Sequence, residues 1–389
     1  MRTLYQKFET LLQSTTTAFK RYLYSNVAWE SRLIGIIGAR GVGKTTMILQ
    51  HIKENLGSKK ALYVSADDMY FGENSLFDLA DDFYKNAGEY LFIDEIHKYI
   101  DWSREIKNIY DSFPTLKVVF TGSSVLDILK GSADLSRRAI IYKLQGLSFR
   151  EYLKLFHNYD IEVFTLEQIL NNEVKLVDIQ HPLPLFNDYL KRGYYPFGIE
   201  NEIDLRLGQI IVQTLESDIP QYANLNVGTS RKLKRLLSII AESVPFKPNF
   251  SKISGMIGVS RNSLDDYFSY MEKAGLIEQL RNETGGIRGL GKVDKVYLNN
   301  TNIVFNLVGE KPNVGNLRET FFFNQMRVKN EVISAKNADF MIEDYTFEVG
   351  GKNKQQSQIE KDGKSFVVKD DIEYGYRNVI PLWTFGLNY

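Results

Sequence analysis

The sequence of 389 residues contains no cysteine. Disulfide bonds, thiolate zinc sites and cysteine nucleophiles are therefore excluded, whereas no cellular compartment is. A surplus of one charge is also missing, since 48 basic residues balance 48 acidic residues and the formal net charge is zero. The charge of the whole chain thus predicts neither nucleic acid nor membrane as a partner, and any basic surface has to be sought locally.

Long apolar runs are lacking as well. No uninterrupted run approaches the roughly 18–20 residues that span a bilayer. Residues 1–9 carry charges where a secretion signal would need its apolar core. We therefore expect a cytoplasmic protein without a membrane partner. The histidines show no metal-ligand spacing; they are His51, His97, His157 and His181.

What the chain does contain is typical of a soluble globular protein. Hydrophobic residues make up 43% and charged residues 25% of the sequence. Tyrosine and phenylalanine are plentiful, at 23 and 24, which favours packed cores over disorder. The length suggests two or three domains.

One short stretch, residues 38–46, fits the phosphate-binding pattern GxxxxGK[ST]. An apolar run of strand type precedes it, and apolar residues at helical spacing follow it. This order points backbone N–H groups and the positive end of a helix dipole at a polyphosphate. We expect Lys44 to reach the β- and γ-phosphates and Thr45 to ligate Mg²⁺. The predicted nucleotide-contacting residues are Gly38, Ala39, Arg40, Gly41, Val42, Gly43, Lys44, Thr45 and Thr46.

Short apolar runs alternate with amphipathic segments from about residue 32 onward. Such alternation predicts an α/β fold, with a parallel sheet covered by helices on both faces. Residues 3–24 precede this region and are expected to form a helical packing element. The predicted strands are residues 33–37, 61–65, 90–93, 116–120 and 139–144.

Two carboxylates follow the apolar run that begins at Tyr90. Asp94 suits the binding of Mg²⁺, because the carboxyl end of a strand beside the glycine loop is where the metal has to be held. Glu95 is the predicted catalytic residue that orients or activates the attacking water. The alternative for Glu95 is a solvated turn carboxylate.

Two further polar groups are candidates for contacts with the γ-phosphate. Thr121 and Ser123 follow the next apolar run, where their hydroxyls would bond the phosphate or the lytic water, or else cap a helix over residues 125–130. Arg138 precedes the last predicted strand, and its guanidinium would stabilise charge in cis or from a neighbouring subunit. Arg137 is expected to be a solvated surface residue.

Four sequence runs occur in a fixed order, namely GARGVGKT, LFIDE, FTGSS and LSRRAIIYKLQGLSFREYL. Together they resemble the predicted ATPases of the AAA+ superfamily in bacteria and archaea, which are related to the STAND group. The resemblance implies an ASCE-type P-loop core with Walker A, Walker B and a polar sensor. The family has a Gly-Arg pair where this chain has Arg137-Arg138, so the arginine is kept and its neighbour differs.

The chain after about residue 150 changes character, because strand alternation stops and helical periodicity takes over. We expect five parts in total. They are an N-terminal helical element (1–29), a P-loop ATPase domain (30–150), a helical lid (151–228), a winged helix-turn-helix (229–285) and an α+β domain similar to restriction endonucleases (286–389).

The pattern of residues 229–285 predicts a short helix, a turn, a second helix and a strand, an order that is typical of a winged helix-turn-helix. Ser260 is a natural N-cap, and residues 261–263 would head the second helix, where side chains meet a groove. The surrounding segment is moderately basic, which favours phosphate contacts. Asp265 and Asp266 lie on the same helix and would oppose a DNA backbone. DNA binding and a role as rigid spacer or protein contact therefore both stay open.

The C-terminal part contains spaced carboxylates of the kind that hold Mg²⁺ in PD-(D/E)xK nucleases. Glu319 lies on a predicted helix, and Asp339 and Glu348 lie on predicted strands. The family that this chain resembles carries a divergent version of that fold. The usual lysine is absent, since Gly350 occupies its position, and Lys352 would come into reach only through a bulge. An inactive fold with structural acids is the alternative.

These patterns together predict an ATPase with ATP and Mg²⁺ as cofactors, acting on or near DNA. Protein partners or self-association are further expectations. The first alternative is a regulatory DNA-binding protein that is switched by slow nucleotide hydrolysis. The second is an active metal-dependent nuclease.

Overall fold

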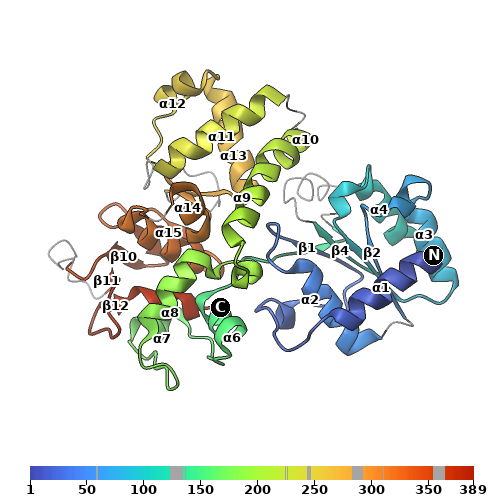
Figure 1. Ribbon diagram of the computed structural model, residues 1–389, viewed down its shortest axis with the longest axis horizontal. Helices are drawn as coiled ribbons and strands as arrows, with labels where there is room; N and C mark the ends of the chain where they lie inside the picture. The colour runs from blue at the N-terminus through green and yellow to red at the C-terminus, as the bar shows by residue number, and fades with distance from the viewer. Residues whose placement is uncertain are drawn as a thin grey trace. The chain divides into compact units, whose positions relative to one another are not determined.

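The computed structural model describes residues 1–57, 60–122, 135, 137–223, 225, 227–242, 247–282, 292–309, 311–353 and 364–389. Ser123 and the predicted helix 125–130 lie outside these residues. The chain divides into two compact units, Met1–Gly146 and Leu147–Tyr389 (Figure 1).

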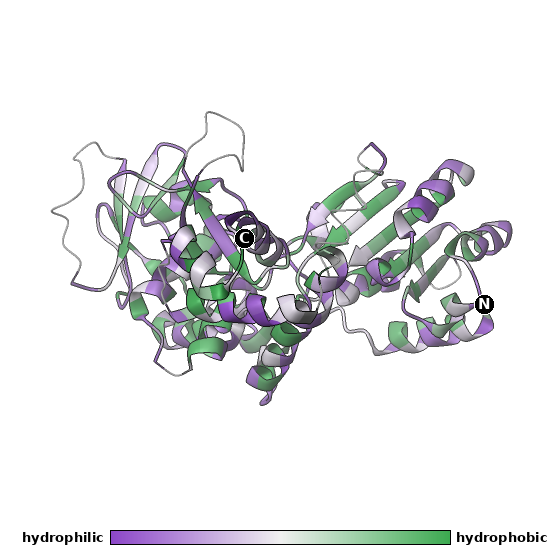
Figure 2. Ribbon diagram, turned by 90° about the horizontal axis from the view of Figure 1, so that it is seen from above, coloured by the Kyte–Doolittle hydropathy of each residue, from purple (hydrophilic) through white to green (hydrophobic). Residues whose placement is uncertain are grey.

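The first unit is built on a sheet of five parallel strands in the order β2-β3-β4-β1-β5. Figure 2 colours these strands largely as hydrophobic, as expected for a parallel sheet that is covered on both faces. The five predicted strands are thus confirmed to within two residues at each end. The strands are β1 (Leu33–Ile37), β2 (Ala61–Ser65), β3 (Tyr90–Asp94), β4 (Lys117–Gly122) and β5 (Ile140–Lys143).

The helices of this unit lie on both faces of the sheet. The connection from β1 to β2 crosses the sheet in the opposite direction to the two connections that follow it. Right-handed crossovers therefore place α2 on one face and α3 and α4 on the other. The helices are α1 (Arg2–Ser14), α2 (Lys44–His51), α3 (Leu76–Lys85) and α4 (Trp102–Ser112).

The helix expected over residues 3–24 is shorter than predicted. It ends at Ser14, and Thr15 is already extended. The chain that follows is held by α2, because Gln50 Nε2 donates to the carbonyls of Thr16 and Phe19 at 2.8 and 2.7 Å. These contacts give the backbone an alternative to helical hydrogen bonding.

The second unit begins with helices and ends with a mixed sheet. Ser148 and Glu151 form a capping box at the start of α6, which fixes where the first helix begins. The helices are α6 (Phe149–His157), α7 (Leu166–Leu170), α8 (Pro182–Asp188), α9 (Ile203–Gln213), α10 (Ile219–Ala223), α11 (Val227–Glu242), α12 (Phe250–Ile257), α13 (Arg261–Lys273), α14 (Thr301–Val308) and α15 (Val314–Met326).

Two sheets belong to this unit. β6 (Ile277–Arg281) and β7 (Val293–Leu298) form an antiparallel pair. The five-stranded sheet has the order β12-β11-β10-β9-β8, with β10, β11 and β12 parallel and the other pairs antiparallel. Its strands are β8 (Val332–Ile333), β9 (Phe340–Ile342), β10 (Tyr345–Gly350), β11 (Ser365–Lys369) and β12 (Val379–Pro381), followed by a 3₁₀ segment, Leu382–Leu387.

One hydrophobic core joins regions that the sequence assigned to different domains. Tyr152 and Tyr189, from the predicted lid, pack in the same cluster as Phe321 and Phe385 from the C-terminal region. Leu280, from β6 in the predicted winged helix, belongs to that cluster as well. The three parts expected after residue 150 therefore form a single compact unit, because their apolar faces bury one another.

Candidate active site

Glycines shape the loop between β1 and α2 where no other residue would fit. Gly41 and Gly43 have φ angles of 78° and 95°, in the left-handed region that side chains rarely adopt. A Cβ atom on Gly38 would lie 2.3 Å from the carbonyl oxygen of Leu144. The loop can therefore curl tightly at the start of α2, as a phosphate-binding loop requires.

Lys44 is held inside this curl. Its Nζ atom donates to the carbonyls of Gly38 and Ala39, both at 2.9 Å, and the residue is only 5% exposed. Burial lowers the pKa of Lys44 to about 8, although the carboxylates of Glu95 and Asp94 act in the opposite direction. A cation that is costly to keep in this position gains most from an anionic ligand.

Asp94 is the centre of a hydrogen-bond network at the carboxyl end of β3. The Thr45 hydroxyl donates to its Oδ2 atom at 2.6 Å, and the Thr121 hydroxyl donates to Oδ1. The residue is buried, at 3% exposure. The structure therefore brings together Thr45 and Asp94, the two predicted Mg²⁺ ligands, which come from different elements.

Tyr63, on β2, also contacts Asp94 and was missed from the sequence. Its hydroxyl donates to Asp94 Oδ2 at 2.8 Å. Burial, together with the Asp94 carboxylate, raises the pKa of Tyr63 above its usual value. A phenol in an otherwise apolar buried strand was the signal that could have revealed it.

Glu95 lies next to this network in an unusual backbone conformation. Its φ of 51° is left-handed, and its amide N–H donates to Asp94 Oδ1 at 3.2 Å. Its side chain is 24% exposed, and its Oε2 atom lies 3.4 Å from Nε2 of the buried His97. Left-handed non-glycine residues concentrate at functional sites. The Glu95 side chain is accessible to water, and its backbone contacts the predicted metal ligand Asp94.

Thr121 is the described member of the two predicted polar sensors. It lies at the end of β4, which separates β1 from β3 in the sheet. Its hydroxyl bonds Asp94, and the amide N–H of Glu95 approaches the same oxygen at 3.4 Å. Thr121 thus links the two carboxylate positions.

Arg138 does not join this cluster. Its Nε and NH2 atoms bond the two carboxylate oxygens of Asp111 at 3.0 and 3.1 Å. Asp111 lies at the end of α4 and Arg138 precedes β5, so both are at the amino edge of the sheet, opposite the glycine loop. A role for Arg138 in cis does not fit this position. Action from a neighbouring subunit stays a prediction.

Arg21 is a second residue that the sequence did not reveal. It is 5% exposed and donates to the carbonyl of Val42 in the glycine loop. It also donates to the carbonyls of Gln145 and Gly146, at 2.7 and 2.9 Å. One buried guanidinium thus ties the glycine loop to the last residues of the unit.

This set of groups fits a magnesium–nucleotide complex. The Thr45 hydroxyl and the Asp94 carboxylate are hard oxygen ligands of the kind that Mg²⁺ prefers. Magnesium sites in such proteins take one or two protein ligands, and phosphate and water supply the rest. Lys44 and the backbone N–H groups at the start of α2 provide the positive field for the phosphates.

The predicted acidic cluster of the second unit is arranged differently. Lys295, from β7, lies between two of its members, with Nζ at 3.2 Å from Glu319 Oε2 and 2.9 Å from Asp339 Oδ1. Tyr297 donates to Glu319 Oε2 at 2.6 Å. Burial and the nearby Asp339 carboxylate raise the pKa of Glu319, against the effect of Lys295. An ammonium group therefore neutralises these acids.

A metal site at this place is not supported by the geometry. Within the part of the chain that the structure describes, no three histidine, aspartate or glutamate residues form a group that could hold a metal ion. Glu348 therefore does not complete such a group with Glu319 and Asp339. Lys352, the proposed substitute lysine, is exposed at the end of the described segment.

The predicted recognition helix corresponds to α13. Ser260 caps it, with its Oγ atom accepting from the Ser263 amide at 3.1 Å. Arg261 and Asn262 are exposed on the first turn, and Asp265 and Asp266 are exposed on the next. α12, α13 and the β6–β7 pair follow the order expected from the sequence, while the assignment as a winged helix stays a prediction.

Two segments of the chain match family models. Residues 30–153 match the family model of an AAA domain. This segment is therefore similar to an AAA domain. Residues 183–313 match a second family model, described as Domain of unknown function (DUF8612). The segment that matches the AAA model contains Lys44, Thr45, Tyr63, Asp94, Glu95 and Thr121, whereas Arg21 precedes it.

A curated protein is also similar to this chain over part of its length. The protein called Uncharacterized protein MJ1637 from Methanocaldococcus jannaschii is 27% identical over 268 residues, covering 64% of this chain and 56% of that protein. The match thus spans little more than half of the relative's length.

Among solved structures, similarity extends to the Walker-type ATPase PABY2304 of Pyrococcus abyssi, with 14% identity, a TM-score of 0.45 and coverage of 75% of this chain and 96% of that one. AMPPCP-bound DnaA from Aquifex aeolicus has 12% identity and a TM-score of 0.27, covering 70% and 88%. TM-scores in this range do not establish a shared overall architecture.

No described helix is both long enough and apolar enough to cross a membrane.

Proposed function

We propose that the Met1–Gly146 unit binds Mg²⁺–ATP and hydrolyses it to ADP and phosphate. The observation that carries this proposal is the hydrogen bond between Thr45 and Asp94 beside the buried ammonium of Lys44. Two metal ligands and a phosphate-binding cation from three positions in the chain meet at one edge of the sheet. The match to an AAA domain supports the same conclusion.

The residues divide the chemistry among them. Lys44 and the N-terminus of α2 hold the phosphates and stabilise the charge that develops on the γ-phosphoryl group. Thr45 and Asp94 would hold Mg²⁺, which neutralises the phosphate oxygens. Glu95 orients a water molecule for in-line attack on the γ-phosphorus and receives its proton. ADP leaves with the electrons of the broken P–O bond.

ATP is the preferred nucleotide in this proposal. The chain has no Asn-Lys-x-Asp motif at the end of the relevant strand to read a guanine base. Competition between ATP and GTP for the protein would test the preference directly.

The decisive experiment separates nucleotide binding from turnover. We expect Glu95→Gln to keep Mg²⁺–ATP affinity within about threefold while lowering kcat by at least about 100-fold, since it removes only proton acceptance. Lys44→Met should weaken binding itself. Glu89→Gln, an exposed glutamate just before β3, serves as the matched control. Unchanged turnover in Glu95→Gln would remove Glu95 from the mechanism.

A second candidate function is a nucleotide-switched DNA-binding protein. The exposed Arg261 and Asn262 at the start of α13 favour it, and the exposed Asp265 and Asp266 oppose it. ATP turnover measured with and without duplex DNA distinguishes the two. Stimulation that is lost in Arg261→Ala supports a DNA-linked function, whereas absent DNA affinity at low salt would exclude it.

A further inference from the structure

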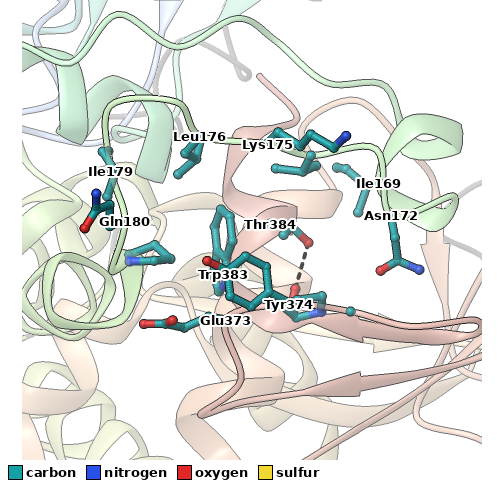
Figure 3. Close-up of a pocket in the computed structure, with 14 residues that line it drawn as sticks. Ile169, Asn172, Lys175, Leu176, Ile179, Gln180, Glu373, Tyr374, Trp383 and Thr384 are labelled. Atoms are coloured by element: carbon teal, nitrogen blue, oxygen red, sulfur yellow. Dashed lines mark hydrogen bonds between the residues drawn. The ribbon is translucent and has the colours of Figure 1, made fainter.

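The Leu147–Tyr389 unit contains a cavity of about 360 Å³, whose walls come from residues 169–182 and residues 373–384 (Figure 3). The lining is mainly apolar and includes the ring of Trp383. Its two charged residues, Lys175 and Glu373, have opposite signs. Such a lining distinguishes no class of ligand, whereas a contact in the Met1–Gly146 unit has a defined chemical consequence.

That contact joins a buried histidine to the predicted catalytic carboxylate. The His97 side chain is 1% exposed, and its Nε2 atom lies 3.4 Å from Glu95 Oε2. An ionised carboxylate only accepts hydrogen bonds, so we assign the imidazole proton to the nitrogen that faces it. The distance is slightly longer than an ordinary N–H···O hydrogen bond. Glu95 is the partner that can close it, because its side chain is 24% exposed whereas His97 is enclosed.

The backbone of Glu95 explains how two residues so close in the chain can meet. Residues two apart on a helix do not face each other. Glu95, however, lies between β3 and the 3₁₀ turn Ile96–Lys98, with φ and ψ of 51° and 38°. A left-handed residue other than glycine persists where the surrounding structure holds it. The local conformation therefore places the Glu95 side chain against His97.

His97 is the fixed member of this pair. The 3₁₀ turn Ile96–Lys98 is fastened to its surroundings by the residue that follows it. The hydroxyl of Tyr99 donates to Glu105 Oε1, in the first turn of α4, at 2.9 Å. The same hydroxyl accepts from the amide N–H of Leu76, the first residue of α3, at 3.2 Å. The imidazole is thus carried by a turn that two helices hold in place.

The orientation of Glu95 against His97 keeps its carboxylate near the groups expected to bind the nucleotide. Burial lowers the pKa of Lys44, and Glu95 is the strongest of the charges that oppose this effect, ahead of Asp94. The amide N–H of Glu95 also donates to Asp94 Oδ1 at 3.2 Å. A carboxylate held by His97 therefore stays beside the phosphate-binding cation and the metal ligand.

We propose that His97 is a positioning residue for ATP hydrolysis, whose Nε2–H group binds one oxygen of the Glu95 carboxylate and so directs the other oxygen at the attacking water. This inference rests on the proposed function of the Met1–Gly146 unit. An exposed glutamate has several rotamers, and not all of them place an oxygen beside a water that is in line with the γ-phosphorus. Holding the productive rotamer raises kcat and leaves ATP affinity unchanged.

Two substitutions of His97 in the full chain test the role of the N–H donor. His97→Leu removes the donor and should lower kcat at least about tenfold, while ATP affinity stays within about threefold of the native value. His97→Gln places an amide N–H where the imidazole has its Nε2–H, so kcat should stay within about threefold of the native value. Equal losses of kcat in the two variants, or a parallel loss of ATP affinity, would contradict the proposal.

His51→Leu separates positioning from packing. It removes another buried imidazole of the same unit, which stacks on Trp29 with ring centroids 4.0 Å apart. Both leucine variants should lower the melting temperature, and only His97→Leu should lower kcat. A comparable loss of kcat in His51→Leu would assign the effect to disturbed packing and overturn the inference.

The double variant with Glu95→Gln tests whether His97 acts through Glu95. His97→Leu should cause no further loss of kcat in that background, because the carboxylate that it positions is gone. A further tenfold loss would mean that His97 acts independently of Glu95. A native chain that hydrolyses no ATP overturns the proposed function and this inference with it. Turnover that depends on Glu95 but survives in His97→Leu overturns this inference alone.

Discussion

The Asp94 carboxylate accepts hydrogen bonds from several side chains. Side chains of Thr45, Tyr63 and Thr121 all donate to it, and these residues lie on three different elements. A carboxylate with this many donors has a fixed orientation, which a metal ligand requires. The position of Asp94 is therefore set by its neighbours and not by its own strand alone.

Tyr63→Phe tests this point. We expect Mg²⁺-dependent affinity for ATP to fall about fivefold, because one hydrogen bond to the metal ligand is lost, while nucleotide binding without Mg²⁺ stays nearly unchanged. Titration with a fluorescent ATP analogue, with and without Mg²⁺, measures both values. Tyr90→Phe is the control, since Tyr90 lies at the amino edge of the sheet. Equal losses with and without metal would contradict the assignment.

Lys44 makes nucleotide binding sensitive to pH. With its pKa lowered to about 8, the free protein carries a neutral Lys44 above that pH, and phosphate binding restores the charge. Binding should therefore take up as much as one proton near about pH 9, and affinity should fall as pH rises beyond about 8. Calorimetry in two buffers of different ionisation enthalpy measures the uptake.

Lys44→Arg is the control for this prediction, because a guanidinium stays charged throughout the range. If this variant takes up as many protons as the native chain, another group is responsible. The lowered pKa of Lys44 also makes the stability of the fold depend on pH. The folded chain without nucleotide binds fewer protons than the unfolded chain between the lowered pKa of Lys44, about 8, and the usual lysine pKa, 10.5. Lys44 therefore adds stability as pH rises through that window.

At the scale of elements, Arg21 connects two segments of the first unit that are far apart in the sequence. It joins the glycine loop at Val42 to Gln145 and Gly146, beyond the end of β5. Tyr22 adds to this contact, because its hydroxyl donates to the carbonyl of Lys143 at 3.3 Å. The segment before β1 therefore binds both the glycine loop and the chain around the end of β5 through side-chain hydrogen bonds.

We expect Arg21→Met to weaken ATP affinity about tenfold, because the loop loses a charged donor that fixes its curvature. Arg32→Met is a matched control. Arg32 also donates to two backbone carbonyls, those of Tyr110 and Phe113, but at the amino edge of the sheet. Both variants should lower the melting temperature, and only Arg21→Met should alter affinity. Equal affinities in the two variants would leave Arg21 with a purely structural role.

The elements of the first unit could be predicted well from sequence for a physical reason. Strands that are buried on both faces are continuous apolar runs, and the glycine loop depends on local backbone geometry. The partners of Arg138 and Arg21 could not be predicted, because Asp111 and Gly146 come close only through the packing of distant elements. Spacing in the sequence carries no information about such pairs.

At the scale of the whole molecule, the second unit also depends on contacts between distant elements, which spacing in the sequence does not reveal. The sequence suggested a lid, a winged helix and a nuclease-like domain, whereas a single core contains aromatic residues from the first and last of these and Leu280 from the second. Lys295 illustrates the consequence, since it comes from β7 and neutralises acids on α15 and just before β9. It fills the position between the carboxylates that a metal ion would need.

Lys295→Met tests whether this ion cluster is structural. Removing the ammonium leaves the buried Glu319 and the partly buried Asp339 without their common cation, which should lower the free energy of unfolding by about 3 kcal/mol. Urea unfolding of the full chain measures the loss. Lys364→Met removes an exposed partner of Asp344 and should cost less than about 1 kcal/mol. Adding Glu319→Gln to Lys295→Met should restore part of the stability, because only one buried acid then lacks a partner. ATP affinity should stay unchanged in all of these variants, and a loss of affinity would instead mean that the second unit contributes to the nucleotide site.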